Sequence, residues 1–183
     1  MYFHNDITFR KLSSETLGQL VALKEDSWLT THQVSIMNDD DELVWFRNLD
    51  TNVHSPRNLV LEAHFSRQDT TFGIFKIFGI DYINRTADVA WDVFKQFRGR
   101  GLGKKIVAGG VAFCFDVLAL HRLNTEILVV NTPSLKCAAT AGFVPEGVKR
   151  QAVHKLGGFI DSIVLGIIVH EWTGQGVGKP TEI

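Results

Sequence analysis

The chain has 183 residues, of which 45% are apolar and 21% charged, and its formal charge is -1. This length suits one domain that buries roughly two-thirds of the surface its unfolded chain exposes. A nearly neutral chain of ordinary globular composition is not expected to bind polyanions in general, so nucleic acid is excluded as the expected partner.

Cysteine and histidine usage indicates a reduced protein without a metal site. Cys114 and Cys137 stand in no CxxC or Cys/His cluster, and the seven histidines have no ligand spacing. The first residues contain no cationic segment followed by a long apolar one, so we expect a cytoplasmic protein. The run SIVLGIIVHEW is interrupted by His170 and Glu171, far short of the ~20 residues that span a bilayer, which predicts a buried strand and no membrane contact.

The first half of the chain predicts one strand, two helices and then three strands. A strand is expected over 7–12 and a helix over 14–26, and in NDDDELVWF Asn38 can cap a second helix with Asp41 three residues on. The next apolar runs are separated by short turn sequences, which are typical of antiparallel neighbours. These three strands are expected over 58–65, 71–83 and 87–94.

The second half predicts a long helix over 101–118, with a broad apolar face, and then a strand, a short helix and two strands. These last elements are expected over 122–130, 134–140, 147–156 and 161–172. The order predicts a single α/β (α+β) domain over 1–172, whose mostly antiparallel sheet of about seven strands is flanked by helices. Residues 173–183 are expected to form a flexible tail.

Gly109 and Gly110 lie in the middle of the long helix, where each glycine costs about 0.5 to 1 kcal/mol relative to alanine. Such a pair indicates that something packs very close to the helix. Packing of the helix against the sheet is favoured over direct contact with a ligand.

The stretch VFKQFRGRGLGKKIV, residues 93–107, places a glycine-rich loop between a strand and a helix, an arrangement that often holds a phosphate. A Walker loop is excluded because Gly103-Lys104-Lys105 has neither the spacing nor the hydroxyl. A dinucleotide fingerprint starting at Gly99 would need its third glycine at Lys104, and Asp116 lies inside the helix rather than after a second strand.

What remains is the spacing Arg-x-x-Gly-x-Gly at Arg98, Gly101 and Gly103, which resembles the acetyl-CoA motif of the Gcn5-related N-acetyltransferases (GNAT). The free amides and dipole of the first helical turn suit a pyrophosphate, and glycines let the backbone close around it. Lys104 and Lys105 could add charge for a further phosphate. The alternative is a glycine-rich connector with two solvated lysines.

The resemblance extends over about residues 6–172. FGIFKIFGIDYINRTADVAWDVFKQFRGRGLG is similar to the third and fourth strands of the family leading into the loop, and LALHRLNTEILVVNTPSLKCAATAGFVPEGVKR is similar to the fifth strand, an Asn-x-x-Ser turn and a helix. The ending GGFIDSIVLGIIVHEW resembles the branch that holds ribosomal-protein N-terminal, spermidine and nucleotide-amino-sugar acetyltransferases.

This resemblance implies the GNAT fold, with acetyl-CoA as co-substrate and no metal. The fourth and fifth strands would splay apart around the pantetheine arm, and the backbone amide of Val93 or a neighbour would stabilise the developing oxyanion while an amine attacks the thioester directly. The implied cofactor-binding residues are Val93, Arg98, Gly99, Arg100, Gly101, Leu102, Gly103, Lys104 and Asn131.

Direct attack by an amine requires a base, and Asp88 matches the acidic position of the family's fourth strand. Asp92 and Glu126 are alternatives, and each carboxylate could instead be an ordinary solvent-face residue of an alternating strand. His64 and His154 are bases by type only, since a lone histidine near a strand is more often structural.

The CoA thiolate also needs a proton donor, and here the sequence departs from the family. Many members place a tyrosine four residues before the Gly-Phe pair, where this chain has Ala138. In the N-terminal acetyltransferase branch the serine of the Asn-x-x-Ser turn resembles a substitute for this tyrosine, and Ser134 of this chain matches that serine. A serine at this position could equally cap the following helix. Cys137, one residue away from Ala138, is expected to pack as a small hydrophobe.

The acceptor side of this fold is built from the first helices, here Trp28 to Trp45, which include the acidic run from Asp39 to Glu42. That run could attract a cationic amine, although a solvated helix start is the favoured interpretation. The resemblance implies N-acetylation of a primary amine, on an amino sugar, a polyamine or a protein N-terminus, and it implies that two chains can pair as a homodimer. The alternative is a non-catalytic acyl-CoA-binding module for sensing or partner binding.

Overall fold

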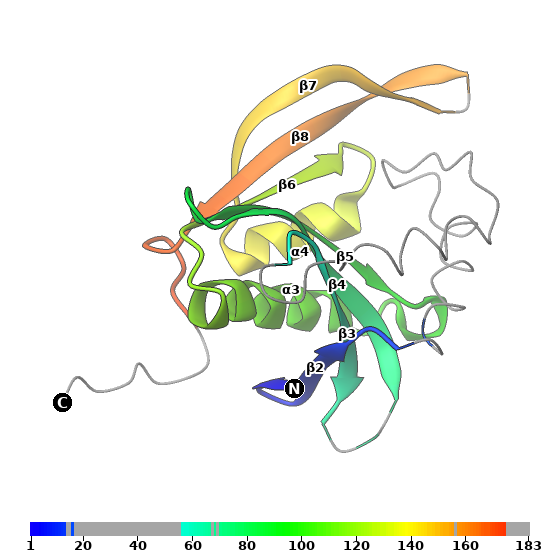
Figure 1. The fold of residues 1–183 in the computed structure, drawn as a ribbon. Coiled ribbons are helices and arrows are strands. Elements are labelled where there is room, and N and C mark those ends of the chain that lie inside the picture. Colours follow the sequence, from blue (N-terminus) through cyan, green and yellow to red (C-terminus); the bar gives the residue numbers. More distant parts are fainter. Residues whose placement is uncertain (14–15, 17–55, 67, 69, 156, 175–183) are drawn as a thin grey trace.

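The computed structural model describes residues 1–13, 16, 56–66, 68, 70–155 and 157–174. The predicted helix over 14–26 apart from residue 16, the predicted helix from Asn38, the acceptor region and residues 175–183 of the predicted tail lie outside them. The described chain forms one twisted sheet with helices packed on one of its faces (Figure 1). Its helices include none that is long and apolar enough to cross a membrane.

The sheet contains all seven predicted strands and a short additional one at its edge. Its order is β1-β2-β3-β4-β5-β6-β8-β7, and every neighbouring pair is antiparallel except β5 and β6. The mostly antiparallel sheet is therefore confirmed. The strands are β1 (Tyr2–His4), β2 (Ile7–Lys11), β3 (Leu59–Phe65), β4 (Thr71–Asp81), β5 (Thr86–Val93), β6 (Arg122–Leu128), β7 (Val144–Lys155) and β8 (Gly158–Ile168).

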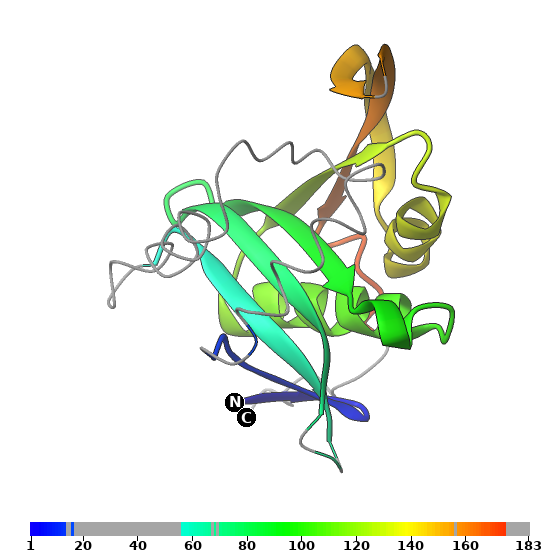
Figure 2. The ribbon, with the colours of Figure 1, turned by 90° about the vertical axis from the view of Figure 1, so that its right-hand side faces the viewer.

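The parallel pair β5 and β6 separates after a few residues. Thr86–Asp88 pair with Arg122–Asn124, and beyond that point β5 stays with β4 while β6 stays with β8. The two strands then diverge, as Figure 2 shows. This confirms the predicted splay between the fourth and fifth of the seven predicted strands.

Two helices cover one face of the sheet. The predicted helix over 101–118 is present as α3 (Leu102–Ala112), followed by a π-helical turn over Phe113–Val117. The second helix, α4 (Thr132–Ala141), packs against α3. In the view of Figure 2, α3 lies behind β3, β4 and β5.

The two glycines inside α3 allow this helix to lie directly on the sheet. A Cβ atom on Gly109 would come within 2.5 Å of Phe9, and one on Gly110 within 2.4 Å of Phe75. Both phenylalanines are fully buried core residues. The close approach predicted from the glycine pair is therefore confirmed, and the helix packs against the sheet at these positions.

The opposite face of the sheet carries polar side chains. Since Phe75 faces α3, its neighbours Ile74 and Lys76 point to the other side, because successive side chains of a strand alternate. The strand register places Glu62 and Asp92 beside Ile74 on that same face. Glu62 and Lys76 are buried polar residues, so this polar face is part of the structured interior and not merely a solvated surface.

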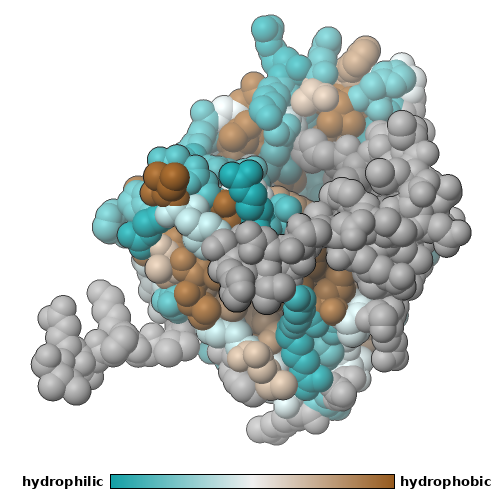
Figure 3. All heavy atoms as spheres, in the orientation of Figure 1, coloured by the Kyte–Doolittle hydropathy of each residue, from teal (hydrophilic) through white to brown (hydrophobic). Residues whose placement is uncertain are grey.

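The outer surface of the described chain mixes apolar and polar side chains, which are interspersed over the face drawn in Figure 3. Among the large apolar side chains that are exposed, Val144 and Val148 lie on β7 and Phe159 lies on β8. Scattered apolar residues of this kind are normal for a folded protein and define no patch by themselves.

Candidate functional site

The glycine loop has the backbone conformation that its sequence predicts. Gly99 and Gly101 have φ values of 77° and 74°, in the left-handed region that glycine adopts without strain. Gly101 is the N-cap of α3 and supplies no side-chain hydrogen bond to the helix. The amide groups of the first turn of α3 are therefore left for another acceptor, such as an anion.

Three elements meet at the end of this loop. A Cβ atom on Gly103 would lie 3.0 Å from Sγ of Cys137 on α4 and 3.6 Å from a methyl carbon of Val93 at the end of β5. The start of α3, the middle of α4 and the end of β5 thus converge at the mouth of the splay. Because Gly103 has no side chain, these three elements lie close together and no side chain of residue 103 fills the space between them.

The backbone of Val93 points into the splay. The amide of Phe94 donates to the carbonyl of Phe72 on β4. Since backbone groups alternate in direction along a strand, the amide and carbonyl of Val93 face the other way, toward β6. Arg98 donates from Nε to the Val93 carbonyl at 3.0 Å, which attaches the loop to the end of β5. The Val93 amide is therefore directed toward the gap between β5 and β6.

The cationic residues of the loop divide into two groups. Lys104 is exposed next to the loop, and the Arg100 guanidinium lies 5.9 Å from the centre of the Phe97 ring. Lys105, in contrast, pairs with Asp6 in the turn between β1 and β2, and this hydrogen bond lowers the pKa of Asp6. The charge of Lys105 is therefore engaged by Asp6, and the suggestion that it serves a further phosphate stays a prediction.

The turn after β6 is organised by Asn131. Its side-chain oxygen accepts from the backbone amide of Ser134 at 3.2 Å and so caps α4. Asn131, and not Ser134, performs the capping role that was the alternative for the serine. The Ser134 hydroxyl forms no hydrogen bond within the described chain, and Ser134 lies one turn before Cys137 on the side of α4 that faces the junction.

The two remaining predictions for α4 concern Ala138 and Cys137. Ala138 is fully buried, so the position where many family members have a tyrosine holds a core alanine in this chain. Burial raises the pKa of the Cys137 thiol, and nearby Lys104 only partly opposes that shift. A neutral thiol that fills space beside Gly103 agrees with the expectation that Cys137 packs as a small hydrophobe.

The candidate carboxylates occupy different surroundings on the polar face. Asp88 is exposed where β5 still pairs with β6. Asp92 forms an ion pair with Lys76, with Oδ2 and Nζ 2.7 Å apart, and both side chains are largely buried. Glu126 accepts from the Ser162 hydroxyl and pairs with Lys149. Asp88 therefore has the most accessible carboxylate of the three.

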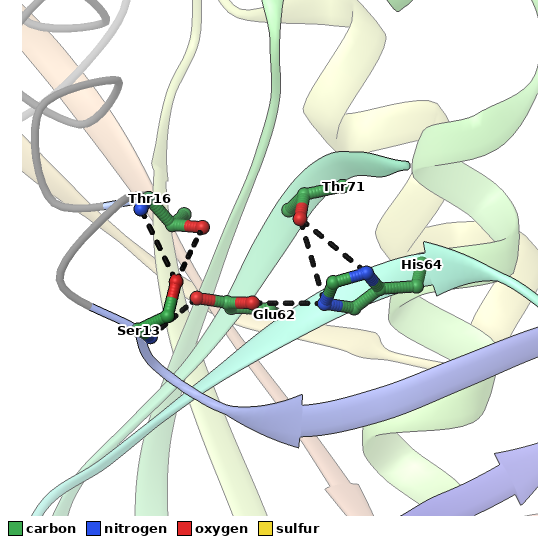
Figure 4. Close-up of polar contacts among 5 residues, drawn as sticks. All are labelled: Ser13, Thr16, Glu62, His64 and Thr71. Atoms are coloured by element: carbon green, nitrogen blue, oxygen red, sulfur yellow. Dashed lines mark hydrogen bonds and ion pairs between the residues drawn. The ribbon is translucent and has the colours of Figure 1, made fainter. Parts of the chain in front are cut away.

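A buried polar network joins the segment that follows β2 to β3 and β4 on the same face (Figure 4). Glu62 accepts from the backbone amide of Ser13 and lies 2.8 Å from Nε2 of His64, and Thr71 lies 3.4 Å from the same ring. Burial opposes the charged form of Glu62, but hydrogen bonds from Ser13, Thr16 and His64 outweigh it and lower the pKa of Glu62. Glu62 is thus a buried carboxylate kept ionised by its partners.

His64 is consequently a structural residue of this network, as expected for a lone histidine near a strand. His154 is exposed on β7, where its ring lies 5.0 Å from that of Phe159. In the described ranges, His, Cys, Asp and Glu side chains form no group of three that could hold a metal ion.

Comparison with known proteins identifies the family to which this fold and loop belong. The family model described as an acetyltransferase (GNAT) domain matches residues 6–144. The chain therefore belongs to the GNAT family of acetyltransferases.

Sequence relatives carry the same activity in their names. The SPbeta prophage-derived uncharacterized N-acetyltransferase YokL of Bacillus subtilis is 28% identical over 148 residues, which cover 73% of this chain and 82% of that protein. The spermidine N(1)-acetyltransferase of Vibrio cholerae is 25% identical over 107 residues, which cover 58% of this chain and 60% of that enzyme.

Solved structures share the fold at low identity. The spermidine N-acetyltransferase from Vibrio cholerae, in complex with CoA and spermine, superposes with a TM-score of 0.82 at 17% identity and covers 92% of this chain and 99% of that one. The dodecameric structure of the same enzyme has a TM-score of 0.75 at 18% identity, with 89% and 94% coverage. These similarities confirm the GNAT fold expected from the sequence.

Proposed function

We propose that this protein transfers the acetyl group of acetyl-CoA directly to a primary amine, on a small molecule such as an amino sugar or a polyamine, or on a protein N-terminus. The observation that carries the proposal is the junction of Val93, Gly103 and Cys137 at the mouth of the splay. It joins an open helix N-terminus to a gap between diverging strands, which suits a ligand with a pyrophosphate and a narrow extended arm.

The residues present fit this ligand. The amides of the first turn of α3, from Leu102 onward, suit the pyrophosphate, and Gly99, Gly101 and Gly103 leave room for it. Arg98 holds the loop against β5, while Arg100 and Lys104 add positive charge. Asn131 shapes the far side of the splay by capping α4. Bound acetyl-CoA supplies an activated thioester carbonyl.

Three groups of this chain would then act on the reaction. The Val93 amide is directed into the splay and would stabilise negative charge on the thioester oxygen as the amine attacks. Asp88 would accept the proton that the ammonium loses. It lies five residues from Val93, about 16 Å along a strand, so the proton would have to pass along a chain of several waters. Ser134 would relay a proton to the CoA thiolate that leaves, and its hydroxyl would be restored by the proton that the nitrogen of the tetrahedral intermediate loses.

A non-catalytic acyl-CoA-binding module is the second candidate function. The observation that favours it is buried Ala138 at the position where many relatives have a tyrosine. Such a protein would bind acetyl-CoA through the same loop and release no thiol with any amine.

Thiol release from acetyl-CoA against a panel of amines, amino sugars, polyamines and peptides separates the two functions. Turnover with at least one acceptor supports the transferase. Tight binding of acetyl-CoA without turnover on the whole panel supports the binding module and contradicts the proposal.

The loop is tested separately by Gly101→Glu and Gly103→Glu. Each places a carboxylate where the pyrophosphate is expected, so calorimetry should detect no binding of CoA. Gly147→Glu is the matched control, because Gly147 lies on β7 and, apart from its chain neighbours, no atom of the described residues lies within 4 Å of its Cβ position. Retained CoA affinity in both loop variants would show that the phosphate site lies elsewhere.

A further inference from the structure

The ion pair of Lys76 and Asp92 lies beside the proposed reaction centre. Asp92 directly precedes Val93, whose amide is directed into the splay, and Lys76 reaches Asp92 from the adjacent strand β4. The Lys76 side chain is 10% exposed and that of Asp92 is 17% exposed. A lysine this well buried inside the otherwise apolar run FGIFKIFGI needs a partner, and Asp92 provides it.

The pair occupies the face from which an acceptor would approach. Helices α3 and α4 close the other face, where Gly110 touches Phe75 and the start of α3 adjoins Val93. Among the described residues, the polar face is the one that α3 and α4 do not cover, so we take an amine to reach a thioester held in the splay from that face. This step rests on the proposed function, because it takes the thioester to lie beside Val93.

From this placement we infer that Lys76 is a specificity-determining residue of the acceptor site. Its ammonium group takes the position beside Asp92 that a second ammonium group of a dicationic acceptor would otherwise fill. With Asp92 neutralised, Asp88 is the accessible carboxylate that this part of β5 offers. The site is therefore built for acceptors with one ammonium group and discriminates against polyamines.

Removal of the lysine should reverse this preference. In Lys76→Met the Asp92 carboxylate loses its partner, and a polyamine can supply the missing cation. A hydrogen bond to a charged group corresponds to about a tenfold to hundredfold change in affinity. We expect spermine to bind the CoA complex of Lys76→Met at least about tenfold more tightly than the CoA complex of the wild type, as measured by calorimetry.

Two further variants separate charge from shape. Lys76→Arg retains the cation and should keep the wild-type preference, whereas Lys76→Met/Asp92→Leu removes both charges and should gain no affinity for spermine. Circular dichroism and thermal unfolding establish that each variant is folded. If Lys76→Met fails to fold, a comparison of Lys76→Arg with Lys76→Gln gives the same contrast.

The outcomes distinguish this inference from the proposed function. The inference is overturned if the folded Lys76→Met or Lys76→Gln protein binds spermine no better than the wild type, or if the neutral double variant gains as much as the single one. It is also overturned if the wild type acetylates spermidine more efficiently than every single-amine acceptor. The proposed function fails independently, by absence of thiol release from the wild type on the whole panel, and the calorimetric comparison still decides the role of Lys76.

Discussion

Gly110 of α3 offers a direct test of the packing that positions the glycine loop. In an ordinary helix, Gly→Ala stabilises the fold by about 0.5 to 1 kcal/mol. At Gly110 the added Cβ atom would lie 2.4 to 2.5 Å from three carbons of the Phe75 ring. Carbon atoms prefer separations of about 3.5 to 4.0 Å, so the ring or the helix must move by about 1 Å.

The expected net effect of Gly110→Ala is destabilising. Overpacking of a core costs about 1 to 3 kcal/mol, and Phe75 is fully buried, so its ring has no free space to enter. After subtraction of the gain in helix propensity, the free energy of unfolding should fall by about 1 to 2 kcal/mol. For a chain of this size that corresponds to a decrease in Tm of about 2 to 8 °C.

Urea unfolding followed by fluorescence measures this change as a shift in the midpoint at constant slope. Gly147→Ala is the control and should change stability by less than about 0.5 kcal/mol, because its Cβ position is open. Phe75→Leu in the Gly110→Ala background should recover part of the loss, and a double-mutant cycle reports the coupling. A more stable Gly110→Ala protein, or a cycle without coupling, would refute the close contact.

Three other predictions concern protonation and catalysis. Burial lowers the pKa of His4, so the unfolded chain takes up a proton below pH 6.5 that the folded chain does not. The free energy of unfolding should therefore fall from pH 7 to 5, and chemical unfolding of His4→Leu should show a smaller fall over the same range. An equal fall in His4→Leu would contradict this cause. The pKa of Glu62 is lowered from 4.5, so its contribution to the free energy of unfolding is complete above that pH and is lost as the pH falls through the pKa of the folded protein. Glu62→Gln should lack this part of the acid unfolding curve. An unchanged curve would exclude Glu62 as the source. Asp88→Asn and Ser134→Ala should each lower kcat by about a hundredfold with acetyl-CoA affinity unchanged, as expected for proton transfer, and a wild-type kcat and pH profile in either would remove that residue from the mechanism.

The elements that sequence patterns predicted correctly are those determined by local chemistry. The helix beginning at the glycine loop was predictable because Gly99 and Gly101 permit left-handed backbone and the apolar stripe after them has helical spacing. The glycine pair Gly109-Gly110 indicated a close approach for the same reason, although it could not identify Phe9 and Phe75 as the neighbours. The three-residue strand β1 was missed because so short a segment carries no period.

Sequence patterns did not show which of the candidate residues for proton transfer has a free carboxylate. Asp88, Asp92 and Glu126 are all carboxylates on alternating strands, and their sequences do not show which is paired. One signal was present for the polar face, since Lys76 is the single charged residue in an apolar run and a buried charge needs a partner. That partner lies on the next strand and becomes apparent only from the register.

The sequence by itself determined the family, the glycine loop and the succession of strands and helices along the chain, because each depends on residues that are neighbours in the sequence. Only the tertiary structure decided that Lys76 neutralises Asp92, that Glu62 binds Ser13 and His64, and that Lys105 is held by Asp6. These pairings join distant segments through sheet register and helix packing. Register sets which side chains share a face, and a shift of one residue would move every side chain of a strand to the other side.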